Sequence, residues 1–259
     1  MDQHTQEKLA ASLTAESTGL LPYLPYLLQD LWELGASPAV MLELVQRHVP
    51  LHEGARVLDL CCGKGAVAIH LAKSLRVAVT GIDAIPEFIA EAQAKAAEHG
   101  VEGLCTFITA DAREAVLRQR GYDATVFGAA GDVLGPPRDT LQALKATVKE
   151  HGCILLDDAY LLEDAAMQDV RYQNYAYPTL AEWEALFDAC GLDRIEMLSG
   201  EEADDAEAVL ASIDRRAAEL TARHPEHAAL FAGYVQSQRD EYYDLDHTVE
   251  GVTWLLRKR

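Results

Sequence analysis

Three acidic residues, Asp59, Asp83 and Asp111, have the types and spacing for a shared chemical task. Each one lies at the end of a short apolar run, as in Val77-Ala-Val-Thr-Gly-Ile before Asp83. Such runs predict buried strands, and the carboxyl ends of parallel strands meet at one edge of a sheet. Three carboxylates at that edge suit a ligand that carries positive charge and hydroxyl groups but no phosphate.

The segment that could bring the main chain close to such a ligand is residues 56–65. Val57, Leu58 and Leu60 are apolar, Gly63 and Gly65 follow, and a helical pattern then begins. This order predicts a buried strand, a tight glycine turn and a helix, in which glycine permits backbone angles that a Cβ would resist. Gly63-x-Gly65-x-x-Ala68 is also a permitted dinucleotide-binding variant, but Asp59 ahead of the turn would repel a pyrophosphate.

These motifs resemble those of the class I S-adenosylmethionine-dependent methyltransferases, including the small-molecule and UbiE-like members. Asp59-Leu-Cys-Cys-Gly-Lys-Gly matches the first motif, Gly-Ile-Asp83 the second and Ala110-Asp111-Ala112 the third. The Cys61-Cys62 pair departs from the more usual Gly or Ala followed by Cys, and it leaves less room beside the ligand. The resemblance implies that S-adenosylmethionine is the cofactor and that ten residues bind it: Asp59, Cys61, Gly63, Gly65, Asp83, Ala84, Asp111, Ala112, Gly128 and Ala129.

Within that set the resemblance implies separate roles. It places Asp59 and the Gly63/Gly65 backbone at the methionine end, Asp83 at the ribose hydroxyls, and Asp111 at the adenine amino group. The alternative for Asp83 and Asp111 is helix capping, because both precede helical sequence. We expect the ligand role for Asp83 and for Asp111.

A general base is harder to identify from the sequence. Asp157, Asp158 and Tyr160 fall at the end of a predicted fifth strand and are the catalytic candidates. Tyr172 and Tyr175 follow that strand, and Tyr23 and Tyr26 lie in the N-terminal segment; these four are the candidates for substrate contact, with core packing as the alternative. The cysteines show no metal-ligand or disulfide spacing, and no metal is expected.

The elements that must position these residues alternate regularly. Strands are expected at about 56–60, 77–82, 104–109, 121–128, 152–160, 193–198 and 249–256, with helices at about 85–99, 113–120, 140–150 and 179–191. This alternation predicts an α/β fold, a doubly wound parallel sheet. The resemblance makes it a Rossmann-like seven-stranded sheet whose last strand is antiparallel.

The chain divides into four expected parts. Residues 1–50 form an N-terminal helical cap or lid, broken into short helices at Pro22 and Pro25. Residues 51–200 form the cofactor-binding core, and residues 248–259 supply its final strand. A helical insertion, residues 201–247, separates strands 6 and 7 and splits near His224-Pro225. Four roles stay open for it: it covers the pocket, it pairs with another subunit, it does both, or it is simply a solvated helical hairpin.

Composition limits the partners. The chain has 22 basic and 42 acidic residues, a formal net charge of −20. That charge repels phosphate backbones, so we expect a small-molecule acceptor and no nucleic acid. No apolar stretch approaches the ~20 residues of a membrane span, and the N-terminus lacks a signal-peptide layout. We therefore expect a cytoplasmic protein without membrane contact, and a homodimer remains open.

Two other functions remain open at this point. A catalytically silent cofactor-binding or scaffold protein would explain the missing base and the long acidic insertion. An NAD-dependent oxidoreductase would also use a glycine turn, and Asp59 argues against it.

Overall fold

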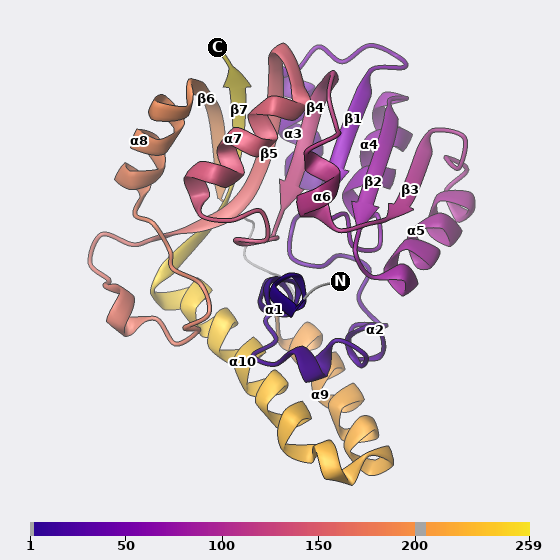
Figure 1. Cartoon of the computed structure of the whole chain (residues 1–259), viewed down its shortest axis with the longest axis vertical. Helices are drawn as coiled ribbons and strands as arrows, with labels where there is room; N and C mark the ends of the chain where they lie inside the picture. The colour runs from indigo at the N-terminus through magenta and orange to yellow at the C-terminus, as the bar shows by residue number, and fades with distance from the viewer. Residues whose placement is uncertain (1–2, 200–205) are drawn as a thin grey trace. The chain divides into compact units, whose positions relative to one another are not determined.

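The computed structural model describes residues 3–199 and 206–259, which contain a seven-stranded sheet in the order β3-β2-β1-β4-β5-β7-β6 (Figure 1). The pairs β1–β2, β1–β4, β2–β3 and β4–β5 are parallel, whereas β7 pairs with β6 in antiparallel fashion. The strands are β1 (Arg56–Leu60), β2 (Ala78–Asp83), β3 (Cys105–Thr109), β4 (Tyr122–Gly128), β5 (Val148–Leu161), β6 (Leu192–Ser199) and β7 (Val249–Lys258). The doubly wound α/β fold with an antiparallel last strand is confirmed.

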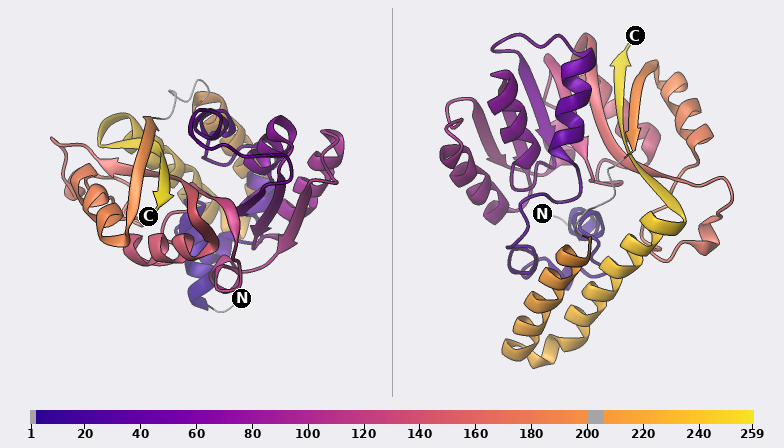
Figure 2. Two further views of the ribbon diagram at one scale, coloured as in Figure 1. Left: turned by 90° about the horizontal axis from the view of Figure 1, so that it is seen from above. Right: turned by 180° about the vertical axis from the view of Figure 1, so that it is seen from behind.

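Helices cover both faces of this sheet, with α3 and α4 on one face and α6 and α7 on the other (Figures 1 and 2). Because both faces are covered, β1 is buried almost throughout, as its apolar run predicts. The α-helices are α1 (Gln3–Ser12), α2 (Leu24–Leu27), α3 (Pro38–His48), α4 (Ala66–Leu75), α5 (Pro86–Glu98), α6 (Ala112–Val116), α7 (Pro137–Thr147), α8 (Leu180–Cys190), α9 (Ala206–Arg223) and α10 (Ala228–His247).

The helix boundaries around β5 differ from the prediction. Helix α7 begins at Pro137, because proline fits the first turn of a helix, and it ends at Thr147 instead of continuing to residue 150. Val148 already pairs with Tyr122, and the register then shifts before Cys153 pairs with Ala124. Strand β5 therefore starts four residues earlier than expected. Helix α6 is also shorter than the 113–120 predicted for it.

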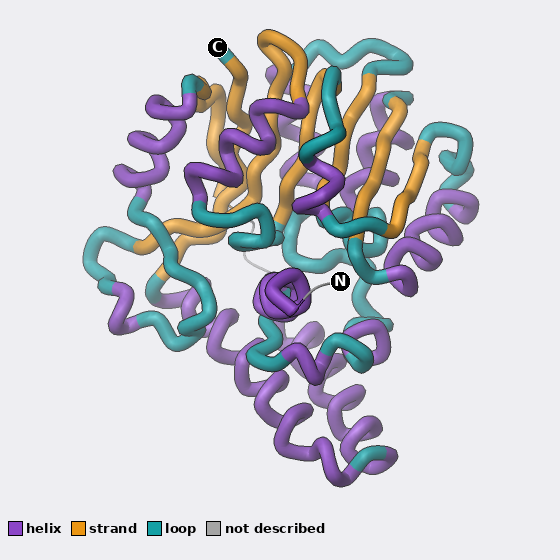
Figure 3. The backbone as a smooth tube through the Cα atoms, viewed as in Figure 1, coloured by secondary structure: helices purple, strands orange, loops and turns teal. Residues whose placement is uncertain are grey.

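The chain separates into two compact units. The helical unit gathers the described parts of residues 1–31, 159–180 and 201–251, and the sheet unit gathers those of residues 32–158, 181–200 and 252–259. In the helical unit α9 and α10 run side by side (Figure 3), joined by the short 3-10 turn Pro225–His227 where the sequence predicts a break. The expected start of the insertion, residues 201–205, lies outside the described residues. A lid role for residues 1–50 stays a prediction.

None of the helices in the described parts of the chain combines the length and apolar character that crossing a bilayer requires.

Candidate cofactor site

The glycine turn predicted between a strand and a helix joins β1 to α4. Cys61, Gly63 and Gly65 have positive φ angles of 60°, 51° and 76°. A Cβ on Gly65 would lie 2.8 Å from the Phe107 ring, so the turn packs too tightly against β3 for any side chain there. Glycine is therefore required at this position of the turn.

Asp59 is the one predicted ligand residue that the fold buries with an unused polar atom. Its side chain lies inside β1 and is 3% exposed, and its Oδ2 atom has no hydrogen-bond partner among the described residues. Burial, together with the nearby carboxylate of Asp83, raises the pKa of Asp59 to about 8, while the backbone N–H of Ala68 opposes the shift. A buried carboxyl oxygen without a donor is rare in native proteins, and a ligand that brings a donor would satisfy it.

Asp83 ends β2 and contacts both the glycine turn and the start of α5. Its Oδ2 accepts a hydrogen bond from the Gly63 N–H at 2.9 Å, and its Oδ1 accepts one from the Ile85 N–H at 2.9 Å. The second contact caps the start of α5, so the capping alternative describes a real interaction. A carboxylate has about four acceptor positions, and these two backbone contacts use half of them. Burial raises the pKa of Asp83 as well.

Asp111 lies at the N-terminus of α6, where its Oδ1 accepts the Arg113 N–H at 2.9 Å. This is the capping geometry considered for it from the sequence. Its neighbour Ala112 is buried as the first residue of the helix. Asp111 therefore has a structural role, and any contact with a ligand would be additional.

The register of the strands brings these three acids to one edge of the sheet. Asp59 pairs with Gly81, and Asp83 pairs with Thr109 at the end of β3. Because β1, β2 and β3 are parallel neighbours, Asp59, Asp83 and Asp111 all lie at their carboxyl ends. The arrangement matches the place where open α/β sheets bind ligands.

A pocket opens at the same edge of the sheet unit. It is lined by Trp32, Leu34, Ala36, Asp59, Cys61, Cys62, Gly63, Lys64, Ala66, Val67, Val126 and Gly128. Four predicted ligand residues belong to this set: Asp59, Cys61, Gly63 and Gly128. Six others, Gly65, Asp83, Ala84, Asp111, Ala112 and Ala129, do not belong to it, so their ligand roles stay predictions.

Glycine at position 128 makes room for Ala36 and for Met41 of α3. A Cβ there would lie 2.7 Å from the Ala36 Cβ and 2.9 Å from the Met41 Cε. The last residue of β4 must therefore be small, as the sequence suggests for the loop that begins there.

Trp32 and Lys64 were missed as site residues. The Trp32 indole N–H donates to the Lys64 carbonyl at 3.1 Å, and its ring stacks on His99 at 5.1 Å. The Lys64 side chain is fully buried, with its Nζ 2.9 Å from the Glu91 carboxylate. A lysine between two glycines was the available signal, whereas the Trp32 contact depends on chain geometry that the sequence does not show.

Of the three catalytic candidates, Asp157 lies nearest the pocket. It pairs with Gly128, which lines the pocket, and it accepts a hydrogen bond from the Thr253 hydroxyl. Burial raises the pKa of Asp157 to about 6, and the Thr253 contact moderates the shift. A carboxyl group that titrates near neutral pH can accept a proton during catalysis.

Asp158 and Tyr160 follow Asp157 along β5, and Tyr160 belongs to the helical unit. Burial and the nearby Glu250 raise the pKa of Tyr160, so less of its basic phenolate form is present at neutral pH. A catalytic role for either residue stays a prediction.

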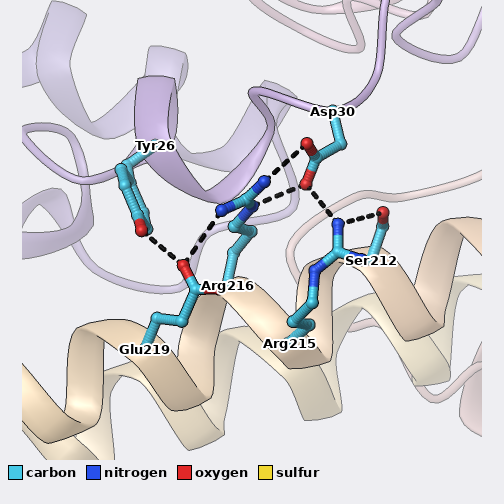
Figure 4. A network of polar contacts seen from close by, with 6 residues as sticks. All are labelled: Tyr26, Asp30, Ser212, Arg215, Arg216 and Glu219. Atoms are coloured by element: carbon cyan, nitrogen blue, oxygen red, sulfur yellow. Dashed lines mark hydrogen bonds and ion pairs between the residues drawn. The ribbon is translucent and has the colours of Figure 1, made fainter.

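Tyr23 and Tyr26 make specific contacts inside the helical unit. The Tyr23 ring packs edge-on against Phe231 at 5.0 Å. The Tyr26 hydroxyl donates to Glu219, beside the ion pairs that join Asp30 to Arg215 and Arg216 of α9 (Figure 4). These contacts agree with the packing alternative, and substrate contact stays a prediction.

Tyr172 and Tyr175 are also held within the helical unit. The Tyr172 hydroxyl donates to the Ala11 carbonyl at 2.8 Å, and the Tyr175 ring packs edge-on against Tyr177 at 4.9 Å. Their predicted substrate contacts are not tested by these interactions.

The described residues contain no group of three or more His, Cys, Asp or Glu side chains arranged to hold a metal ion. The five cysteines of the chain are free thiols. Burial raises the pKa of both Cys61 and Cys62, and neighbouring acids add to the shift, so neither is an activated nucleophile.

Comparison with known proteins agrees with this geometry. Residues 57–152 match a family model described as a methyltransferase domain. The chain is 38% identical over 74 residues to a 23S rRNA (uracil(1939)-C(5))-methyltransferase, RlmD, of Shewanella amazonensis, covering 29% of this chain and 16% of that protein. It is 27% identical over 157 residues to the uncharacterized protein YjhP of Escherichia coli, covering 59% of this chain and 63% of that protein.

Among solved structures, the chain resembles a methyltransferase from Geobacter sulfurreducens that is described as S-adenosylmethionine-dependent and in complex with S-adenosylhomocysteine. The TM-score is 0.78 at 23% identity, covering 92% of this chain and 98% of that one. The likeness shows the fold, and the family match covers the glycine turn, the three acids and β4. Residues 57–152 are therefore a methyltransferase domain, carried on the fold of the class I S-adenosylmethionine-dependent methyltransferases.

Proposed function

We propose that this protein binds S-adenosylmethionine at the edge of the sheet unit and transfers its methyl group to a small-molecule acceptor. The observation that carries the proposal is the buried Asp59, which lines the pocket beside the glycine turn and whose Oδ2 atom finds no donor in residues 3–199 and 206–259. A ligand with a cationic ammonium group would supply the donor and stabilise the ionised form of this carboxyl group.

The residues around the pocket fit the cofactor in charge and shape. Asp59 would hold the ammonium group of its methionine part, and the remaining acceptor positions of Asp83 would take ribose hydroxyls. The glycine turn, fixed by Asp83, presents backbone close to the ligand. When bound, the cofactor supplies a sulfonium-activated methyl group, and the sulfur keeps the bonding electrons as S-adenosylhomocysteine leaves.

The chain's own task in such a reaction is to align the acceptor, exclude water and receive a proton where the acceptor has one to lose. Asp157 is the proposed general base, because it lies in β5 opposite Gly128, the last residue of β4, and titrates near neutral pH. Asp158 and Tyr160 remain secondary candidates on the same strand.

A small acceptor fits the charge of the chain. One relative is named an rRNA methyltransferase, but the shared segment covers 16% of that protein. With a formal charge of −20 this chain repels a phosphate backbone, so we propose a small molecule and not RNA.

Titration calorimetry with S-adenosylhomocysteine, with NAD as the comparison ligand, tests the cofactor assignment. We expect saturable binding of S-adenosylhomocysteine and none of NAD. No binding of S-adenosylhomocysteine at millimolar concentration would refute the proposal. Release of S-adenosylhomocysteine from S-adenosylmethionine with an added acceptor would exclude the alternative of a silent cofactor-binding protein.

A further inference from the structure

A short segment just before α3 forms one wall of the pocket in the sheet unit. Trp32, Leu34 and Ala36 line the pocket, whereas Glu33 and Gly35 between them are exposed. Every second residue of the segment therefore faces the pocket. This wall comes from outside the three motifs that the sequence singles out.

Close packing holds the segment against the pocket. A Cβ on Gly63 would lie 3.2 Å from the Leu34 Cδ1 atom, so Leu34 lies on the glycine turn. A Cβ on Gly35 would lie 2.5 Å from the Ala129 Cβ, and Gly35 has a φ angle of 96°, which favours glycine. The segment thus packs on the glycine turn and on the residue that follows β4.

Trp32 begins this segment, and side chains from two helices pack around its ring. The ring stacks on His99 with centroids 5.1 Å apart and an interplanar angle of 12°. The His70 ring lies 5.3 Å away, and the Lys95 Nζ atom lies 5.3 Å from the ring centre. With the ring held in this way, the indole N–H donates to the Lys64 carbonyl at 3.1 Å.

That hydrogen bond acts on the peptide group between Lys64 and Gly65, inside the glycine turn. The N–H of this peptide group, which belongs to Gly65, donates to the Cys62 carbonyl at 2.9 Å. Its carbonyl accepts from Trp32, so both polar ends of the peptide group are held. Glycine restricts its own backbone angles very little, and contacts from outside the turn must therefore select one conformation.

We propose that Trp32 is a positioning residue for the cofactor, and that its hydrogen bond to the Lys64 carbonyl holds the glycine turn in the shape that receives the methionine part of S-adenosylmethionine. A turn that is already ordered loses less conformational freedom when a ligand binds, and affinity is higher for that reason. This inference rests on the proposed function and adds to it a residue that none of the motifs contains.

The test compares two ligands that differ only at the end assigned to the turn. S-adenosylhomocysteine carries the amino acid group, whereas 5′-methylthioadenosine keeps the adenosine and sulfur and lacks that group. Trp32→Phe retains an aromatic ring beside His99 and removes the N–H donor. Trp183→Phe is the matched control, because Trp183 belongs to the same unit and packs in the core against Phe187 and Trp254.

Calorimetry, with displacement titration for the weaker ligand, gives the Kd of each pair. We expect Trp32→Phe to raise the Kd for S-adenosylhomocysteine about threefold to tenfold, as the loss of one hydrogen bond implies, and that for 5′-methylthioadenosine less than about twofold. Trp183→Phe should lower the Tm through lost core packing and change both Kd values less than about twofold. A general loss of stability would not distinguish the two ligands.

A second measurement needs no variant. Of the three tryptophans of the chain, Trp183 and Trp254 are buried and Trp32 is partly exposed. Quenching of tryptophan fluorescence by acrylamide therefore reports mainly on Trp32. Saturation of the unmodified chain with S-adenosylhomocysteine should lower the quenching constant, because the ligand covers the pocket that Trp32 lines.

Four results would overturn the inference: an unchanged Kd for S-adenosylhomocysteine in Trp32→Phe, equal weakening of both ligands, an equal loss in Trp183→Phe, or no protection from acrylamide. Binding of S-adenosylhomocysteine to the unmodified chain separates the two claims. If it binds and Trp32→Phe binds it equally well, the role of Trp32 is wrong and the cofactor assignment stands. If it does not bind, the proposed function itself fails.

Discussion

Replacing Asp59 with Asn should make the protein more stable and a poorer binder of its cofactor. The pKa of Asp59 rises from 3.8 to about 8 on folding. Between these values the folded chain binds a proton that the unfolded chain has released, so stability falls as pH rises through this window. The interval from the unfolded pKa to pH 7 is about three pH units. It corresponds to a loss of at most ~4 kcal/mol in the free energy of unfolding at pH 7.

An Asn side chain has the same shape and no proton to take up. We therefore expect Asp59→Asn to raise the Tm by several degrees at pH 7, with a smaller gain at pH 5, since about 1 kcal/mol shifts the Tm of a chain of this size by roughly 2–4 °C. The loss of a charge-assisted hydrogen bond, about 1.5–3 kcal/mol, should raise the Kd for S-adenosylhomocysteine by roughly 10- to 150-fold.

Thermal unfolding at pH 5, 7 and 8 and calorimetry with S-adenosylhomocysteine measure these effects. Asp123→Asn is the matched control, because the Asp123 carboxylate accepts from Lys149 at 2.6 Å and its pKa is lowered. That variant should lose stability and keep its cofactor affinity. A lower Tm for Asp59→Asn at pH 7, or an unchanged Kd, would refute the reasoning.

Four further predictions follow from the same structure. Asp83→Ala should raise the Kd for S-adenosylhomocysteine about tenfold or more by calorimetry, because it removes the acceptor that fixes the glycine turn; an unchanged Kd would contradict this role. Asp157→Asn should lower kcat by about 10²-fold or more and abolish an acidic limb near pH 6 in the rate profile, and a retained limb would exclude Asp157 as the base. Gly128→Ala should cost about 1–3 kcal/mol in chemical denaturation, because its Cβ meets Ala36 and Met41, and no loss would show that these neighbours can move. Asp30→Asn should lower the Tm more at low salt than at high salt, because salt screens the ion pairs drawn in Figure 4. These ion pairs lower the pKa of Asp30. Their contribution to stability is therefore present at neutral pH and is lost as the pH falls below the ordinary pKa of an aspartate.

Much of the sheet could be predicted from the sequence because its signals are local. Strands β2 and β4 are apolar runs that end at Asp83 and Gly128, and Asp59 is the second-last residue of β1. The parallel arrangement then brings Asp59, Asp83 and Asp111 to one edge. Asp83 shows the limit of such reasoning. Ligand binding and capping were weighed as competing roles, yet the carboxylate has enough acceptor positions for both.

Other parts of the site depend on contacts between distant segments. The Trp32 indole reaches the Lys64 carbonyl across 32 positions of the chain, and Thr253 reaches Asp157 across 96 positions. Neither pair carries a spacing signal. The early start of β5 also escaped prediction, because residues 148–150 fit a helical pattern until pairing with β4 decides their conformation.

The buried polar residues Ser237 and Asp244 of α10 could not be predicted from the sequence. They occur in a stretch that reads as a charged, solvated helix, and the sequence alone gives no reason to bury them. Ser237 donates to the Thr14 carbonyl and Asp244 accepts from the backbone of Arg171 and Tyr172, and these contacts between distant segments bury both side chains.

The electrostatic role of Asp59 can be measured directly through proton release. At pH 7 this carboxyl group is mostly protonated in the free protein, and an ammonium ligand should drive it to its ionised form. Calorimetry of S-adenosylhomocysteine binding in two buffers of different ionisation enthalpy counts the protons. We expect the unmodified chain to release about one proton at pH 7 and Asp59→Asn to release none; binding without proton release from the unmodified chain would contradict the account.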